Sequence, residues 1–317
     1  MLWLMAPGLT ARAAAETRPF LAYHESWLEV PAVTAAETRL ARLPSYVGIV
    51  ALAFVRPDAV YEGRLRLDRT GLQYPFDGVM LREAAALLRQ RNPDTRIVLS
   101  VGGATYGGWA DLNEGAIARL VSDLGLDGVD IDFEPAHPGC RRQAGDGISC
   151  RTDGQLQAIV ERLRARLPRP LLLTVAGWSV GAYGEGAFEQ AMPKSAYTGM
   201  MLPLLRSSAA RHIDLVSIMA YEAGPLFDPL EAYRAYRAEW AGQLALGVLA
   251  GTVQPAAIAD AVGGMARHIR PDPLAGMMLY ALSTDADESR SLEPAARPLA
   301  GAMCEALSLR GCDMPVP

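Results

Sequence analysis

The sequence lacks any apolar stretch as long as the roughly 20 residues that a transmembrane helix needs. It also lacks a run of basic residues, and its formal net charge is −5 at pH 7. Nucleic acids and anionic membrane surfaces attract basic proteins, so we expect neither as a partner. Half of the residues are hydrophobic and 21% are charged, which is typical of a folded soluble protein. We expect a monomer.

Cysteine and histidine are scarce, with four residues of each. No C-x-x-C pair occurs and the histidines do not cluster, so we expect neither a bound metal nor a cofactor. The cysteines form two close pairs, Cys140 with Cys150 and Cys304 with Cys312. We predict two short-loop disulfides, as in an exported protein; free thiols in a cytosolic protein are the alternative.

The N-terminus begins with a short apolar run and continues with "ARAAAE", whose small residues are typical of a signal-peptidase site. No Lys or Arg precedes the apolar run. We interpret residues 1–16 as a degenerate or truncated export signal, with a disordered tail as the alternative. Residues 17–317 are then one domain, and a secreted or periplasmic location is expected.

Short apolar segments recur along the chain at fairly even intervals, and several are apolar on both faces, as in parallel strands covered by helices. The eight predicted strands are residues 19–23, 46–54, 96–103, 127–133, 171–178, 213–221, 244–251 and 275–282. Amphipathic segments between them predict helices that include residues 82–92, 113–125, 154–167 and 228–242. This alternation predicts an α/β fold, a (β/α)8 TIM barrel. A doubly wound open sheet is the alternative, but no G-x-G-x-x-G follows the first strand.

The predicted fourth strand lies in "GLDGVDIDFEP" (125–135), which holds the acids Asp127, Asp130, Asp132 and Glu134. Side chains alternate along a strand, so the last three acids share one face, with neighbours roughly 6.5–7 Å apart. Like charges this close in a poorly hydrated place shift one another's pKa. TIM-barrel enzymes work at the C-terminal ends of their strands, which places Glu134 at the mouth and Asp130 deepest.

Three roles could account for these acids. A divalent cation could bind them, but such sites usually collect ligands from several strands or from one loop. A purely structural cluster is disfavoured because unpaired buried charge is unfavourable. General acid–base catalysis at a glycosidic bond is the interpretation that the acids favour.

The spacing D-x-x-D-x-D-x-E at residues 127–134 resembles the signature of glycoside hydrolase family 18, which contains chitinases and endo-β-N-acetylglucosaminidases. "SVGG" (100–103) resembles the S-x-G-G box of that family, and "IMAY" (218–221) resembles its M-x-Y box. The first-strand "YHESW", which begins at Tyr23, is also similar. The resemblance implies that residues 17–317 form a catalytic TIM barrel.

The resemblance also implies a retaining, substrate-assisted mechanism in which the N-acetyl group of the sugar is the nucleophile and an oxazolinium forms. Glu134 is then the general acid and base. Asp132 orients the acetamide, Asp130 shares a proton with Asp132, and Tyr221 donates a hydrogen bond to the acetamide carbonyl. Asp127 is expected to brace the start of the strand. Residues expected to pack rather than react are Ser100, Gly102 and Gly103.

Sugars stack on aromatic faces, and three tryptophans, Trp27, Trp109 and Trp178, follow predicted strands at the open end of the barrel. Each is either a sugar platform or a core residue. Tyr23, Glu222 and Tyr280 are also expected to bind the substrate, and Met219 is expected to bind it from the floor of the site. Trp240 lies in a predicted helix and is expected to be structural.

The chain departs from the family pattern in three places. Tyr280 occupies the position of the usual floor tryptophan, and Glu222 follows Tyr221 where an aspartate is common. The stretch between the seventh and eighth predicted strands is too short for the α/β insertion of processive chitinases. We therefore predict hydrolysis of β-1,4 bonds in chitin oligomers, with N-glycan cores or other N-acetylglucosamine glycans as the second choice. A non-catalytic chitinase-like lectin is the alternative of another class.

Overall fold

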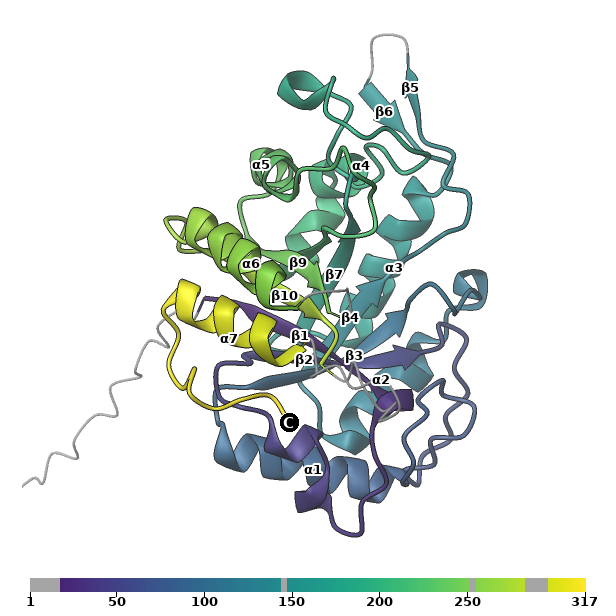
Figure 1. Ribbon diagram of the computed structural model, residues 1–317. Helices are drawn as coiled ribbons and strands as arrows, with labels where there is room; N and C mark the ends of the chain where they lie inside the picture. Colours follow the sequence, from purple (N-terminus) through teal and green to yellow (C-terminus); the bar gives the residue numbers. More distant parts are fainter. Residues whose placement is uncertain (1–17, 144–146, 251–254, 283–295) are drawn as a thin grey trace, which may run out of the picture.

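Eight parallel strands close into a barrel in the computed structural model, which describes residues 18–143, 147–250, 255–282 and 296–317 (Figure 1). Around the barrel the strands follow the order β1-β10-β9-β8-β7-β4-β3-β2. Their bounds are β1 (Phe20–Glu25), β2 (Ile49–Val55), β3 (Arg96–Gly102), β4 (Gly128–Asp132), β7 (Leu172–Trp178), β8 (Leu215–Met219), β9 (Gln243–Leu249) and β10 (Ala275–Tyr280). Each overlaps one predicted strand, so the TIM-barrel prediction is confirmed and the open-sheet alternative is excluded. The predicted export segment, residues 1–16, lies outside the described ranges.

Helices surround the barrel (Figure 1). They are α1 (Gly78–Arg91), α2 (Glu114–Leu124), α3 (Asp153–Arg166), α4 (Leu202–Arg206), α5 (Pro229–Glu239), α6 (Pro255–Ile269) and α7 (Ala296–Leu307). Short 3-10 helices are η1 (Ser26–Leu28), η2 (Ala35–Glu37), η3 (Leu40–Arg42), η4 (Trp109–Asp111), η5 (Gly186–Phe188) and η6 (Ser208–His212). Side-chain caps fix the starts of α1, α2 and α5, where Asp77, Asn113 and Asp228 each accept a backbone N–H. In the part of the chain that the structure describes, no helix is long and apolar enough to cross a membrane.

Strand alternation separates the barrel interior from the outer core. On β1, Leu21 and Tyr23 belong to the interior cluster, whereas Phe20 and Ala22 pack in the outer one. On β4, Val129 and Ile131 pack outward. Asp130 and Asp132 therefore point into the barrel, as their spacing predicts.

The connection between β9 and β10 contains α6, which packs beside α7 (Figure 1). Residues 255–274, the described part of this connection, hold α6 and a short turn and no α/β insertion.

Both predicted disulfides are present, Cys140–Cys150 and Cys304–Cys312. The first encloses an element that the sequence did not predict: β5 (Arg141–Gln143) and β6 (Gly147–Ser149) pair antiparallel and project from the barrel (Figure 1). The segment that this disulfide closes therefore contains a small hairpin.

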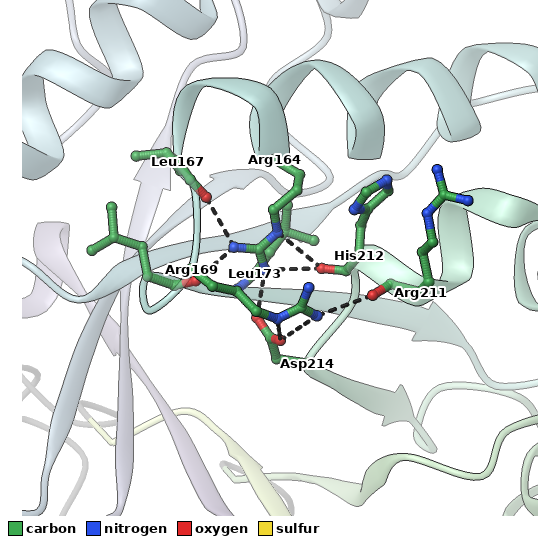
Figure 2. A network of polar contacts seen from close by, with 8 residues as sticks. Arg164, Leu167, Arg169, Leu173, Arg211, His212 and Asp214 are labelled. Carbon is green, nitrogen blue, oxygen red and sulfur yellow. Dashed lines mark hydrogen bonds and ion pairs between the residues drawn. The ribbon is translucent and has the colours of Figure 1, made fainter.

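A buried arginine braces the N-terminal ends of β7 and β8 (Figure 2). Arg164 of α3 pairs with Asp214 at 2.5 Å and donates further hydrogen bonds to the carbonyl oxygens of Leu167, Leu171 and His212. Asp214 in turn accepts the backbone N–H of Leu173 at 2.9 Å. Because Arg164 lies in α3, Leu173 in β7 and Asp214 directly before β8, the network ties these three elements together at the end of the barrel opposite the mouth.

Candidate active site

Three hydroxyl groups hold the carboxylate of Asp130 inside the barrel. The strand register places Ser100 of β3 and Thr174 of β7 opposite Asp130. Ser100 Oγ donates to Asp130 Oδ2 at 2.8 Å, and Thr174 Oγ1 donates to Oδ1 at 2.6 Å. Tyr23 Oη donates to Oδ2 at 2.9 Å. Burial raises the pKa of Asp130 while the three hydrogen bonds oppose that rise, so both oxygens are supplied with the donors that an ionised carboxylate needs.

Asp132 is buried next to Asp130 without such support. Its side chain is on the same face, the residue is 3% exposed, and Oδ1 has no hydrogen-bond partner among the described residues. Burial, the charge of Glu134 and the charge of Asp130, in that order, raise the pKa of Asp132 well above its usual value. A buried carboxyl oxygen without a partner is unfavourable for folding, so packing alone does not account for it.

Glu134 lies two residues beyond the end of β4 and is half-buried. Burial and then the charge of Glu222 raise its pKa, against a hydrogen bond from the backbone of Ala104. A raised pKa keeps more of this carboxyl protonated near neutral pH, as a general acid requires. Burial thus increases from Glu134 through Asp132 to Asp130, in the order expected from the sequence.

Two glycines let the end of β3 approach the acidic strand. The backbone N–H of Gly103 donates to the carbonyl oxygen of Asp132 at 2.9 Å. Gly102 has φ +108°, and a Cβ atom there would lie 2.1 Å from that same oxygen. Ser100 is not only a packing residue, because its hydroxyl contacts Asp130 directly. The S-x-G-G segment therefore supplies one donor and a close backbone contact.

Five aromatic side chains, Tyr23, Trp27, Phe54, Tyr221 and Tyr280, lie together at the mouth and are here called the aromatic group. The Phe54 ring stacks near-parallel to Trp27 at 5.9 Å and to Tyr280 at 6.3 Å between centroids. Tyr280 also lies 6.1 Å from Tyr221 and 5.4 Å from Tyr23. Trp27 is 39% exposed, so its ring is accessible to a sugar.

Tyr221 connects the aromatic group to the acids. Burial raises its pKa well above the usual value, and the charges of Asp132 and Glu134 contribute to the rise. Its hydroxyl therefore stays protonated and can donate a hydrogen bond. Met219, two residues earlier, is 8% exposed and packs in the interior cluster beneath this region.

The other predicted tryptophans are placed differently. Trp109 is 7% exposed and packs edge-on against Phe133, whose side chain points out of the barrel, which fits the core-residue alternative for Trp109 and not the sugar platform. Trp178 is half-buried and stacks on Tyr197 at 3.7 Å, which leaves at most one ring face for a sugar. Trp240 is 9% exposed and donates to the Gln243 carbonyl, in a structural position.

Asp127, the first acid of the motif, lies at the opposite end of β4. Its Oδ2 accepts the backbone N–H of Ile97 at 2.8 Å, and Arg89 and Arg96 each approach it at 3.6 Å. Asp127 thus joins the starts of β3 and β4 and lies away from the barrel mouth. Glu222, by contrast, is exposed at the mouth, and its charge reaches Glu134.

Sequence reasoning missed three residues of the site: Thr174, Phe54 and Tyr197. Thr174 is a single hydroxyl within an apolar strand, and only the register with Asp130 gives it a role. Phe54 ends a predicted strand, where an aromatic residue could have been noticed. Tyr197 lies in an irregular segment, and its pKa is raised by burial and by Glu134, which places it beside the acid.

Within the described part of the chain, no group of three or more His, Cys, Asp or Glu side chains has the arrangement of a metal site. Asp130 is held by three hydroxyl donors, whereas metal-binding carboxylates direct their oxygens at the cation.

A pocket of about 560 Å³ adjoins the site between β8, β9 and α6, and Tyr221 and Glu222 line part of it. The arrangement is suited to proton transfer and to binding a polar group that donates to Asp132.

No protein-family profile matches the chain. A curated relative, exochitinase 1 of Streptomyces olivaceoviridis, is 25% identical over 206 residues, which cover 60% of this chain and 34% of that protein. The chain thus spans about a third of the length of this relative. Among solved structures, a GH18 chitinase from Pseudoalteromonas aurantia is similar with a TM-score of 0.62 and 18% identity, over 91% of this chain and 100% of that one. YKL-39, solved in the presence of chitooligosaccharides, is similar with a TM-score of 0.60 and 12% identity, over 91% of this chain and 99% of that one.

Proposed function

We propose that this chain, a member of glycoside hydrolase family 18, hydrolyses β-1,4 bonds on the reducing side of N-acetylglucosamine units. Chitin oligomers are the proposed substrate. The S. olivaceoviridis relative carries the name exochitinase, and the acids that the family motif requires are all present in this chain. The described part of the connection between β9 and β10 contains no α/β insertion, which suits an open groove for soluble chains.

One observation carries the proposal: the buried Oδ1 of Asp132, which has no partner among the described residues, belongs to a side chain between a carboxylate with three donors and a carboxyl with a raised pKa. A donor from a bound ligand would satisfy this oxygen. The N–H of a sugar acetamide supplies one. A sugar hydroxyl would also satisfy this oxygen. Only an acetamide, however, has a carbonyl oxygen that can attack the anomeric carbon.

In the proposed reaction, Glu134 donates its proton to the oxygen of the leaving sugar. The acetamide carbonyl oxygen attacks the anomeric carbon, the glycosidic bond breaks, and a cyclic oxazolinium forms. Glu134, now ionised, takes a proton from water, which opens the ring at the anomeric carbon. The configuration is retained, and Glu134 is again protonated for the next cycle.

Asp132 and Asp130 stabilise this intermediate. Three hydroxyls donate to Asp130 and oppose the rise of its pKa, whereas the pKa of Asp132 is raised well above its usual value, so in this proposal the shared proton of the pair resides on Asp132. Asp132 accepts the acetamide N–H through Oδ1 and holds the group in line for attack. Tyr221 donates its hydroxyl proton to the acetamide oxygen, and Tyr280 lies beneath the sugar in place of a larger tryptophan.

An assay with three substrates tests the proposal. Chitotetraose is expected to be cleaved, whereas cellotetraose, which has hydroxyls in place of the acetamides, is expected to remain intact. Product analysis by mass spectrometry measures both. A high-mannose glycoprotein is the third substrate; its cleavage with chitotetraose left intact would favour an endo-β-N-acetylglucosaminidase. Binding of chitotetraose with no cleavage of any substrate would make the chain a lectin and refute the proposed hydrolysis.

A further inference from the structure

We propose that Glu25 binds the protonated amine of a glucosamine unit, next to the N-acetylglucosamine at the cleavage site, so that partly deacetylated chitin is a preferred substrate. This inference rests on the proposed function and names the substrate class more closely. It begins from a buried acid that the proposed reaction does not use. Glu25 is the last residue of β1, two positions after Tyr23.

Glu25 points into the barrel mouth. In the strand register, Tyr23 lies opposite Ala51 and Glu25 opposite Ala53, and both alanines belong to the interior cluster. Tyr23 reaches Asp130 from this face, so Glu25 lies one step nearer to solvent on the same face. The charge of Glu25 is, after burial, the largest cause that raises the pKa of Tyr280, which places the carboxyl beside the aromatic group.

The Glu25 carboxyl is buried, and one of its two oxygens lacks a partner among the described residues. The residue is 7% exposed, and its Oε2 makes no hydrogen bond within the described structure. None of the ion pairs in the described ranges includes Glu25. Burial raises the pKa of this carboxyl to about 7. An unpaired acid at this depth destabilises the free protein, and a ligand cation would offset that cost.

The surrounding charges favour a cation over a neutral donor. After burial, the charges of four acids, Glu25, Asp132, Glu134 and Glu222, raise the pKa of Tyr280. The field at the mouth is therefore negative. N-acetylglucosamine is neutral, whereas glucosamine carries an amine that is protonated near neutral pH, and Trp27 offers an exposed ring on which the same sugar can stack.

The test compares affinities in a protein that cannot turn over its ligand. Calorimetry measures the dissociation constants of chitotetraose and of a chitotetraose with one internal glucosamine, in Glu134→Gln and in Glu134→Gln with Glu25→Gln. We expect Glu25→Gln to weaken binding of the glucosamine-containing ligand by about tenfold or more, because an ion pair is lost. Binding of chitotetraose is expected to change by less than about threefold.

A matched control is Glu222→Gln, which removes one negative charge from an exposed position of the same mouth. The ratio of the two affinities should stay within about twofold in this variant, because exposed charges interact weakly. An equal loss for both ligands in Glu25→Gln would show that Glu25 is a general hydrogen-bonding or structural residue, and no loss would show that it does not touch the sugar; either result overturns the inference. Because binding is measured, the outcome is independent of whether the wild type cleaves chitotetraose.

Discussion

Replacing Glu134 with Gln is expected to lower kcat on chitotetraose by roughly 10²–10⁴-fold, the usual contribution of a general acid. The amide has nearly the same shape as the carboxyl but cannot donate a proton to the leaving oxygen. Since Glu134 is only half-buried, the fold and the aromatic group should be unchanged, and binding of chitotetraose should persist. Initial rates by reducing-end assay, with binding by calorimetry, measure the two effects separately.

The control for this variant is Glu222→Gln, which keeps the acid and removes the neighbouring charge that raises the pKa of Glu134. A lower pKa means that Glu134 loses its proton at a lower pH. The alkaline limb of the pH profile of kcat/KM should therefore move to lower pH. The acid itself remains, so turnover below that limb should persist. If Glu134→Gln kept more than a tenth of the wild-type kcat, Glu134 would not be the acid.

Replacing Asp132 with Ala is expected to lower kcat by roughly 10²–10³-fold, because the acetamide loses its orienting acceptor and the oxazolinium loses its neighbouring carboxyl. The stability of the folded protein, in contrast to its activity, should not fall. Asp132 Oδ1 has no partner in the described structure and the charged form of the side chain is disfavoured by burial, so its removal should leave the free energy of unfolding unchanged or increase it. Urea unfolding followed by circular dichroism measures this free energy.

Asp127→Ala is the matched comparison, since it removes another acid of the same motif. Asp127 accepts the backbone N–H of Ile97 and lies beside two arginines, far from the mouth. Its loss should lower the free energy of unfolding by about 1–3 kcal/mol and leave kcat within a few-fold of the wild type. Near-normal turnover in Asp132→Ala would argue against assistance by the acetamide.

The eight barrel strands could be predicted because each is a short apolar run between turn signals, and parallel strands buried on both faces leave that pattern in the sequence. The order of burial of Asp130, Asp132 and Glu134 followed from alternation within one strand. Both of these properties are local. The Cys140–Cys150 pairing was also accessible, since the two residues are close in sequence.

The parts of the site that depend on contacts between distant strands could not be predicted. Thr174 acquires its role only when β7 lies beside β4 in one register, which closure of the barrel determines. For the same reason, the sequence left open whether Trp109 is a sugar platform or a core residue. Trp109 follows Gly108, which has φ +83°, in a turn that directs the indole to the outward-facing side chain of Phe133 instead of to the mouth.

The stereochemistry of the first product tests the central claim, that the acetamide of the substrate attacks the anomeric carbon. Proton NMR during the first minutes of chitotetraose hydrolysis distinguishes the two anomers at the new reducing end before they interconvert. We predict the β-anomer, because the acetamide and then water approach from opposite faces and two inversions give retention. An α-anomer as the first product would show direct attack by water and would contradict the mechanism.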